Sequence, residues 1–236
     1  MYLLMANILL FFFGIGALVT GYLNKNSQVA QARERWLKLG VYFLILILVF
    51  FSIYTDHVRL LAVCIGIVGL YEIVKAHLFS ERPLLFFCPI VVLYIALIVA
   101  FINFGHRTST EKVCSIYFTI VIFDGFSQLC GQLFGKRKLI PRISPNKTFE
   151  GLIGALVIVT STSLFLFPSI DLSFTQTLKT TLFICVSALM GDLLASWYKR
   201  SCQIKDYGTL IPGHGGVLDR FDSFIFSGAM YGLIYL

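Results

Sequence analysis

The stretch LLFFCPIVVLYIALIVAFINF, Leu84–Phe104, decides the fold class because it runs for 21 residues without a charged side chain. An α-helix needs about 20 apolar residues to cross the hydrocarbon core of a membrane. The whole chain shares this character, with 58% hydrophobic and 13% charged residues among its 236, whereas soluble domains have about 25% charged residues. We therefore predict an all-α, polytopic integral membrane protein and exclude a soluble globular domain.

Seven further apolar segments flank this stretch, which gives about eight transmembrane helices. The first has no basic stretch before it and no cleavage site after it, so we expect a retained membrane helix rather than a signal peptide. No repeat or low-complexity linker divides the chain, and residues 1–236 are expected to form a single membrane-embedded domain. The expected segments are Tyr2–Tyr22, Leu39–Thr55, Leu60–Val74, Leu84–Phe104, Val113–Phe134, Gly151–Ile170, Leu178–Trp197 and Ser223–Leu236.

The basic residues predict the orientation of these helices. Alternate loops hold 15 of the 19 lysines and arginines, namely residues 23–40, 75–82, 135–150 and 198–222. Because basic loops stay in the cytoplasm, we expect these loops inside, the N-terminus outside, and the plasma (inner) membrane as the location. The net charge of +7 then needs no nucleic-acid partner. The basic segment Asn26–Gly40 fits either an interfacial helix or an ordinary charged loop.

The six cysteines do not indicate a cross-link or a metal site. None of them forms a C-x-x-C pair, and five lie inside apolar segments. A disulfide framework or a zinc site has recognisable spacings, which are missing here. We expect the cysteines to pack as small apolar side chains between helices.

Two aspartates lie inside apolar segments, Asp124 and Asp192. A carboxylate at the centre of a bilayer costs roughly 2.5–3.5 kcal/mol on insertion scales, so it is expected to face a cavity or a partner. Asp192, Ser196 and Lys199 are spaced i, i+4, i+7 and share one helical face. That face leads from the membrane to the last cytoplasmic loop.

Asp219 and Asp222 add two more carboxylates, which share a face if the last helix begins near Leu218. Several carboxylates with room for water and phosphate suit Mg²⁺. A buried ion pair, a hydrogen bond between helices, or a solvated helix start favoured by the helix dipole are the structural alternatives.

The loop between these acids is rich in groups that bind phosphate. Three glycines, Gly213, Gly215 and Gly216, let backbone amides approach an anion closely, and His214 offers another donor. The cations of this loop are Lys199, Arg200, Lys205 and Arg220. Cations, glycine amides and metal-binding carboxylates together predict a polyphosphate site.

A second basic patch covers Gly135–Gly151. Ser144 followed by Pro145 is typical of a helix N-cap with proline at the first helical position. A helix starting there would direct free amides and its positive dipole end toward an anion, with Lys147 beside them. Anchoring of the helix by positive charge alone is the simpler alternative.

The segment SWYKRSCQIKDYGTLIPGHGGVLDRFD, Ser196–Asp222, closely resembles the signature of phosphatidate cytidylyltransferases, also called CDP-diacylglycerol synthases. SPNKTFEG, which begins at Ser144, and DGFSQLCGQLFGK, Asp124–Lys136, resemble two upstream motifs of that family. The resemblance is specific over residues 111–236 and weak over residues 1–110, which indicates a short, divergent member. The long motif departs from the family pattern at Tyr198. Further departures occur at Ser127, Gln128 and Gln132, which would bear on substrate choice if they touch the lipid phosphate or the nucleotide.

The resemblance implies transfer of a cytidylyl group from CTP to phosphatidate, which gives CDP-diacylglycerol and pyrophosphate. It also implies Mg²⁺, a second cation nearby, surrounding membrane lipids and a homodimer. On this hypothesis the metal ligands are Asp192, Asp219 and Asp222, with Asp124 as a further candidate. The catalytic residues are Lys199, Arg200, Lys205, His214 and Arg220. The substrate-binding residues are Ser144, Lys147, Ser196, Gly215 and Gly216.

Four other hypotheses fit parts of the sequence. A transporter or channel would carry acids deep in several helices and lack the H-G-G loop. A CDP-alcohol phosphatidyltransferase would need an arginine where Leu129 stands. A CTP-dependent lipid or prenol kinase, or a related enzyme acting on another lipid phosphate, would use similar groups. A degenerate membrane scaffold would not need the intact acids and cations.

Overall fold

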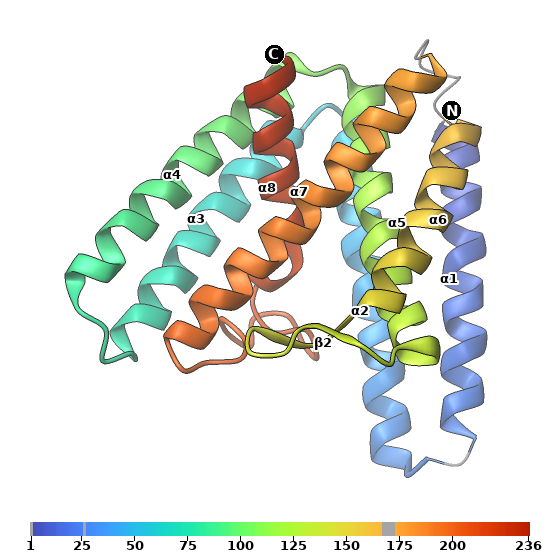
Figure 1. The fold of residues 1–236 in the computed structure, drawn as a ribbon, viewed down its shortest axis with the longest axis horizontal. Coiled ribbons are helices and arrows are strands. Elements are labelled where there is room, and N and C mark those ends of the chain that lie inside the picture. The colour runs from blue at the N-terminus through green and yellow to red at the C-terminus, as the bar shows by residue number, and fades with distance from the viewer. Residues whose placement is uncertain (1, 26, 167–172) are drawn as a thin grey trace.

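The computed structural model describes residues 2–25, 27–166 and 173–236, and Figure 1 shows its fold. The described residues form eight α-helices and one short β-hairpin, which confirms the all-α class and the eight predicted segments. The end of the sixth predicted segment, residues 167–170, lies outside the described residues. The elements are α1 (Tyr2–Asn24), α2 (Val29–Tyr54), α3 (Val58–Leu78), α4 (Leu84–Arg107), α5 (Thr110–Phe134), β1 (Lys138–Ile140), β2 (Ser144–Thr148), α6 (Phe149–Leu166), α7 (Phe174–Ser201) and α8 (Leu218–Tyr235).

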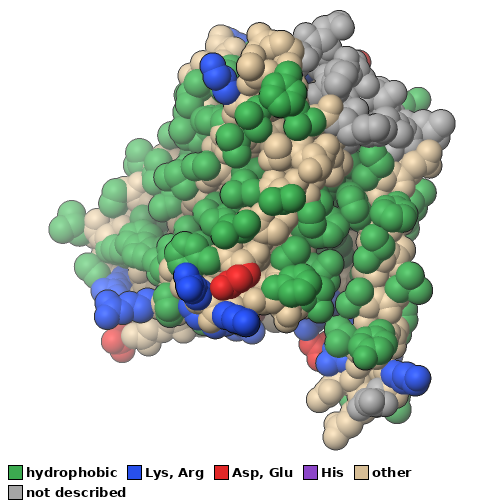
Figure 2. All heavy atoms as spheres, turned by 45° about the vertical axis from the view of Figure 1, so that its right-hand side comes forward, with side chains coloured by type: hydrophobic (Ala, Val, Ile, Leu, Met, Phe, Trp, Pro, Cys, Tyr) green, Lys and Arg blue, Asp and Glu red, His purple; other side chains and the backbone are tan. Residues whose placement is uncertain are grey.

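The bundle has the apolar exterior that a bilayer requires. Five of the described helices, α1, α2, α4, α5 and α7, are long and apolar enough to cross a membrane. Large apolar side chains such as Leu18, Phe51 and Val157 are exposed on the outside of the bundle. In Figure 2 hydrophobic side chains cover most of the visible wall, and most of the charged ones gather at its lower edge. The chain is therefore a polytopic integral membrane protein.

Small residues bring the central helices close together. A Cβ added to Gly151 of α6 would lie 2.5 Å from the carbonyl oxygen of Ser127 on α5. A Cβ on Gly191 of α7 would lie 2.7 Å from Cβ of Phe226 and 2.9 Å from the carbonyl oxygen of Asp222, both on α8. Glycine at such crossings is typical of membrane helices, whose backbones approach where side chains are small. The close approach of α7 and α8 holds Asp192, the neighbour of Gly191, beside Asp222.

The four basic loops lie at one end of the bundle, as predicted, and both chain ends lie at the other end (Figure 1). Two hydrogen bonds join these loops. Arg82 Nε donates to the carbonyl oxygen of Ser201 at 2.9 Å, and Arg200 Nε donates to that of Ile143 at 3.4 Å. We call this end of the molecule the charged end.

The predicted helix start at Ser144 is wrong, because residues 144–148 form β2 and α6 begins at Phe149. A residue before proline favours extended backbone, and proline is tolerated in an edge strand such as this one. β2 pairs antiparallel with β1, with Ile140 opposite Ser144. Thr148 replaces Ser144 at the helix start: its Oγ1 accepts a hydrogen bond from the amide of Gly151 at 3.1 Å.

The basic segment at residues 26–40 is neither a separate interfacial helix nor a loop over its described part. From Val29 onward it forms the first turns of α2, which continues to Tyr54. Arg35 Nη1 donates to the carbonyl oxygen of Leu23 and to Oδ1 of Asn24, both at 3.0 Å, and so ties the end of α1 to α2. In Figure 1 this helical hairpin extends beyond the other elements of the charged end. Asn26 itself lies outside the described residues.

Candidate functional site

An ion pair between the hairpin and α7 marks the centre of the charged end. Nζ of Lys147, on β2, lies 2.5 Å from Oδ2 of Asp192, and both side chains are largely buried. The other oxygen of Asp192 accepts a hydrogen bond from Ser196 Oγ at 3.2 Å. The predicted shared face of Asp192 and Ser196 is therefore confirmed, and Ser196 orients the carboxylate.

Two more carboxylates converge on the same lysine. Burial lowers the pKa of Lys147, but three nearby carboxylates raise it by more, so its pKa lies above that of an ordinary lysine. These carboxylates belong to Asp192 of α7, Asp124 of α5 and Asp222 of α8. We call these three side chains and Lys147 the acidic cluster. Three acids and one ammonium leave the cluster with a formal charge of −2 when all are ionised.

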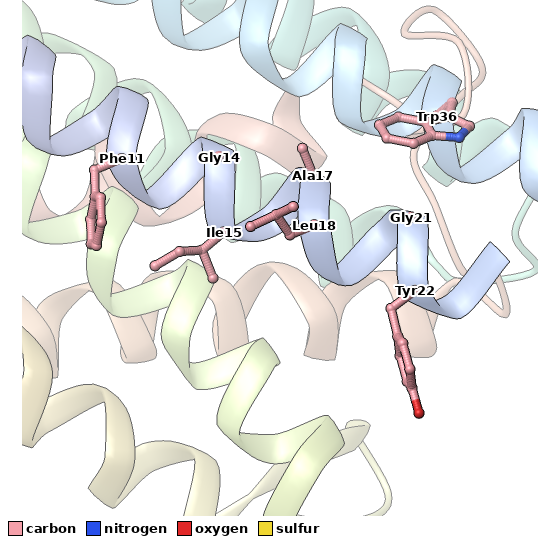
Figure 3. Close-up of a pocket in the computed structure, with 8 residues that line it drawn as sticks. All are labelled: Phe11, Gly14, Ile15, Ala17, Leu18, Gly21, Tyr22 and Trp36. Carbon is pink, nitrogen blue, oxygen red and sulfur yellow. The ribbon is translucent and has the colours of Figure 1, made fainter. Parts of the chain in front are cut away.

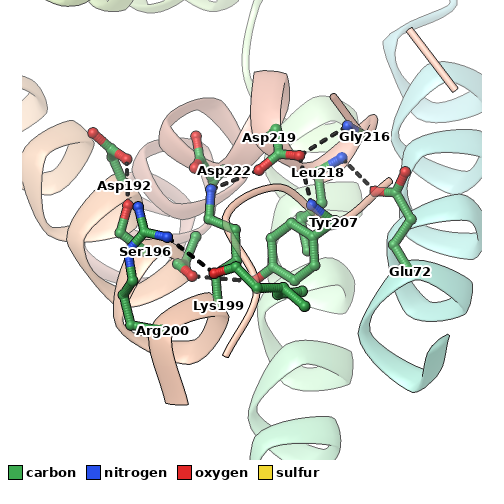
Figure 4. A network of polar contacts seen from close by, with 12 residues as sticks. Glu72, Asp192, Ser196, Lys199, Arg200, Tyr207, Gly216, Leu218, Asp219 and Asp222 are labelled. Atoms are coloured by element: carbon green, nitrogen blue, oxygen red, sulfur yellow. Dashed lines mark hydrogen bonds and ion pairs between the residues drawn. The ribbon is translucent and has the colours of Figure 1, made fainter. Parts of the chain in front are cut away.

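Asp219 lies next to the acidic cluster but serves as the centre of a second network, drawn in Figure 4. Its Oδ1 lies 2.6 Å from Nζ of Lys199, in an ion pair whose side chains are 10% and 1% exposed. Its Oδ2 accepts from the amides of Tyr207 and Gly216, both at 2.8 Å. Asp219 thus joins the end of α7, the following loop and the start of α8.

Glu72 of α3 completes this network and was not predicted as a site residue. It is only 1% exposed, and its Oε1 and Oε2 accept from the amides of Val217 and Leu218, both at 2.8 Å. A carboxylate placed at free amides where a helix begins is favoured by hydrogen bonding and by the helix dipole. The signal that could have found it is an acid inside an apolar segment, the rule applied to Asp124 and Asp192.

The glycines of the loop are required by packing against these carboxylates. Gly215 adopts a φ of +87°, and Gly213 a φ of +74°. Residues other than glycine rarely adopt this backbone conformation. A Cβ on Gly216 would lie 2.5 Å from Oε1 of Glu72. Close approach to protein carboxylates therefore explains Gly215 and Gly216 independently of any bound phosphate, whereas Gly213 packs against Lys38.

His214, at the tip of the loop, faces α2. Its ring is nearly parallel to that of Tyr42, at an interplanar angle of 9° and a centroid distance of 6.4 Å. A Cβ on Gly213 would lie 3.1 Å from Cγ of Lys38, so the loop tip rests against α2. The structure thus adds α2 to the site, although α2 contains none of the motifs found in the sequence.

The remaining predicted cations differ in their surroundings. Arg200 donates to the carbonyl oxygens of Ile143 and Ile204, which links the β-hairpin to the loop. Lys205 and Arg220 are exposed. Ser144, at the start of β2, is partly buried.

The donor set of the site bears on metal binding. Among the described residues no group of three or more His, Cys, Asp or Glu side chains is arranged to hold a metal ion by itself. Mg²⁺, however, is usually held by one or two carboxylates together with water and substrate phosphates. The all-oxygen donors and surplus negative charge of the acidic cluster fit such a site. Oδ1 of Asp219, by contrast, is already paired with Lys199.

Two hollows in the described part of the chain lie outside the acidic cluster. The first, of about 800 Å³, runs along the outer face of α1 and is lined by residues from Phe11 to Tyr22 and by Trp36. Figure 3 shows that none of its lining side chains is charged, so it offers nothing to a phosphate. The second, of about 330 Å³, opens between α3 and the loop and includes Lys75 and Tyr207.

Comparisons with known proteins agree with the motifs. The family model described as "Cytidylyltransferase family" matches residues 1–236. Proteins named phosphatidate cytidylyltransferase are similar to this chain. One from Staphylococcus haemolyticus is 36% identical over 160 residues, which cover 66% of this chain and 60% of that protein.

Two further relatives carry the same name. One from Bacillus subtilis is 46% identical over 114 residues, or 47% of this chain and 42% of that protein. One from Staphylococcus aureus strain COL is 36% identical over 161 residues, or 66% of this chain and 60% of that protein. The match therefore spans about half of the length of these relatives.

Proposed function

Since the chain belongs to the cytidylyltransferase family, we propose that it transfers a cytidylyl group from CTP to phosphatidate, giving CDP-diacylglycerol and pyrophosphate. The observation that carries this proposal is the acidic cluster, in which Asp124, Asp192 and Asp222 surround Lys147 beside a cationic loop. The proteins named phosphatidate cytidylyltransferase support the choice of substrates.

The reaction requires anions to be brought together rather than a protein nucleophile to be activated. An oxygen of the phosphatidate phosphate attacks the α-phosphorus of CTP, and the bond to the β-phosphate breaks to release pyrophosphate. The attacking phosphate is already anionic at neutral pH. Catalysis then depends on positioning and on stabilising the charge that develops on the leaving group.

The acidic cluster is the proposed place of Mg²⁺. Asp192, Asp222 and Asp124 are the proposed ligands, and the bound metal would neutralise the triphosphate and the developing charge on pyrophosphate. The convergence of three carboxylates on one ammonium supports a divalent cation at this position. A second cation beside it is part of the same proposal. Asp219 contributes by holding Lys199 and the start of α8 in place.

The cations and donors around the cluster divide into two groups. Lys147, Lys205 and Arg220 are proposed to bind phosphate directly, since the first reaches into the cluster and the other two are exposed. The second group shapes the site. Arg200 and Ser144 hold the hairpin near the loop, and Ser196 orients Asp192.

The location of the cluster suits an amphipathic substrate. The charged end borders an apolar wall, so the acyl chains of phosphatidate can stay among membrane lipids while the head group meets soluble CTP. The basic loops favour a cytoplasmic position of this end, and we propose the plasma membrane as the location. We also propose a homodimer, which light scattering of the purified protein in detergent tests.

Purified protein with phosphatidate, Mg²⁺ and radiolabelled CTP tests the function. We expect label in CDP-diacylglycerol, identified by its mass, one pyrophosphate per lipid, and loss of turnover on chelation of Mg²⁺ that is reversed by adding it back. Asp192→Asn is expected to lower turnover at least 100-fold. Release of CDP instead of pyrophosphate would indicate a kinase, and an Asp192→Asn variant with normal turnover would remove the proposed metal ligand.

A further inference from the structure

The paired rings of Tyr42 and His214 have the geometry of a slot for a planar group. Their planes are within 9° of parallel, and their centroids are 6.4 Å apart. This separation is near the upper end of the range for direct ring contact. A planar ring held between them needs a contact of about 3.5 Å on each of its faces, so the loop tip would have to move away from α2 to admit it.

The loop tip is built to permit such an opening. His214 lies between Gly213 and Gly215, which both adopt positive φ. Its backbone is anchored by a hydrogen bond from its amide to the carbonyl oxygen of Ile211 at 2.9 Å. The ring is therefore carried by an ordered turn with glycine on either side, where small changes in φ and ψ are absorbed easily.

The slot lies beside the acidic cluster. The charged groups that act on the Tyr42 hydroxyl are Asp124, a member of the cluster, and Arg220. Arg220 also acts on His214, together with Lys38. A triphosphate bound at the cluster would therefore place the other end of the nucleotide near these two rings.

We propose that Tyr42 and His214 bind the nucleotide base by stacking on its two faces, so that α2 supplies one wall of the base site. The identity of the base as cytosine rests on the proposed function, whereas the slot itself rests on ring geometry. Both residues are partly buried. Burial lowers the pKa of His214; its hydrogen bond to the Pro212 carbonyl opposes this, and Arg220 and Lys38 lower the pKa further. A neutral imidazole is thus available for stacking at pH 7.

The test separates binding of the base from binding of the phosphates. Dissociation constants for CTP and for inorganic pyrophosphate are measured by calorimetry on the full-length protein in detergent with Mg²⁺. Tyr42→Leu is expected to weaken CTP binding about tenfold, the range of base–aromatic stacking, and to leave pyrophosphate binding within twofold. Tyr42→Phe keeps the ring and should bind CTP like the wild type.

The matched control is Phe43→Leu, the neighbouring residue, whose ring packs on Phe13 of α1 at a centroid distance of 4.4 Å. It should change neither constant. If Tyr42→Leu does not fold, His214→Ala gives the same readout from the loop side.

Three results would overturn the slot. They are CTP binding that is unaffected by loss of either ring, equal weakening of CTP and pyrophosphate, and wild-type protein that binds pyrophosphate but not CTP. A wild type that binds CTP through Tyr42 yet forms no CDP-diacylglycerol would refute the proposed function and leave the slot standing. Normal turnover together with CTP binding that needs neither ring would refute the slot and leave the proposed function standing.

Discussion

Glu72→Gln tests whether the Glu72 carboxylate holds the start of α8, because the substitution changes one oxygen to an amide nitrogen and keeps the size of the side chain. In the structure both carboxylate oxygens accept backbone amides, Oε1 from Val217 and Oε2 from Leu218. Glutamine can satisfy one of them. Its NH₂ group then faces the other backbone N–H, so that one hydrogen bond is lost and two donors oppose each other.

The expected loss of stability follows from these contacts. A hydrogen bond to a charged group contributes about 1.5–3 kcal/mol, and a buried donor left without a partner costs about 1–3 kcal/mol. The surviving bond also weakens because the acceptor is no longer charged. Since Glu72 is only 1% exposed, water cannot replace the lost partner, and we expect unfolding to be favoured by about 2–4 kcal/mol. For a chain of this size that corresponds to a fall in Tm of about 10 °C.

Thermal unfolding in detergent, followed by fluorescence, measures this effect, and cytidylyl transfer is assayed on the same samples below the melting range. Glu81→Gln is the matched control, because Glu81 is exposed and the change should be neutral within about 0.5 kcal/mol. We also expect reduced turnover in Glu72→Gln, since α8 carries Asp219 and Asp222. A Tm within 2 °C of the wild type, together with unchanged turnover, would refute the assigned role of Glu72.

Two further substitutions probe the loop and the acidic cluster. Gly216→Ala places a Cβ about 2.5 Å from Oε1 of Glu72, so it should lower Tm in the same unfolding assay, and a normal Tm would contradict the close approach. Lys147→Met removes the ammonium of the acidic cluster and should reduce cytidylyl transfer about 100-fold. Lys136→Met, at an exposed position shortly before β1, should not reduce it. Equal effects of the two substitutions would show that Lys147 acts only through general surface charge.

The sequence was sufficient to predict the fold class and the charged end, for physical reasons. A membrane helix must be apolar over its whole length, so each segment leaves a clear signal in the chain itself. The alternation of basic loops likewise needs no tertiary information. Asp192 and Ser196 could be placed on one face because the spacing within a single helix fixes their relation.

Features that depend on contacts between distant segments could not be predicted in this way. Ser144-Pro145 satisfies the rules for a helix start, but pairing with β1 decides its conformation. Glu72 is marked only as an acid inside an apolar segment, and Tyr42 carries no local pattern; the partners of both lie 145 residues or more away in the chain. Each becomes recognisable only when the loop after α7 is folded against α3 and α2.

The residues of the longest motif separate into two groups according to what they contact. Asp219 pairs with Lys199 and accepts from Gly216, and Glu72 accepts from Val217 and Leu218, so their charges and donors are already balanced without a ligand. The acidic cluster is different, because its three carboxylates share one ammonium within the cluster, with Lys199 and Arg220 acting on it from outside. A buried charge without a counter-ion is unfavourable, and the binding of a cation with its nucleotide would relieve it. Changes in the first group should therefore lower stability and turnover together, whereas replacing an acid of the cluster should lower turnover and leave stability unchanged or increased.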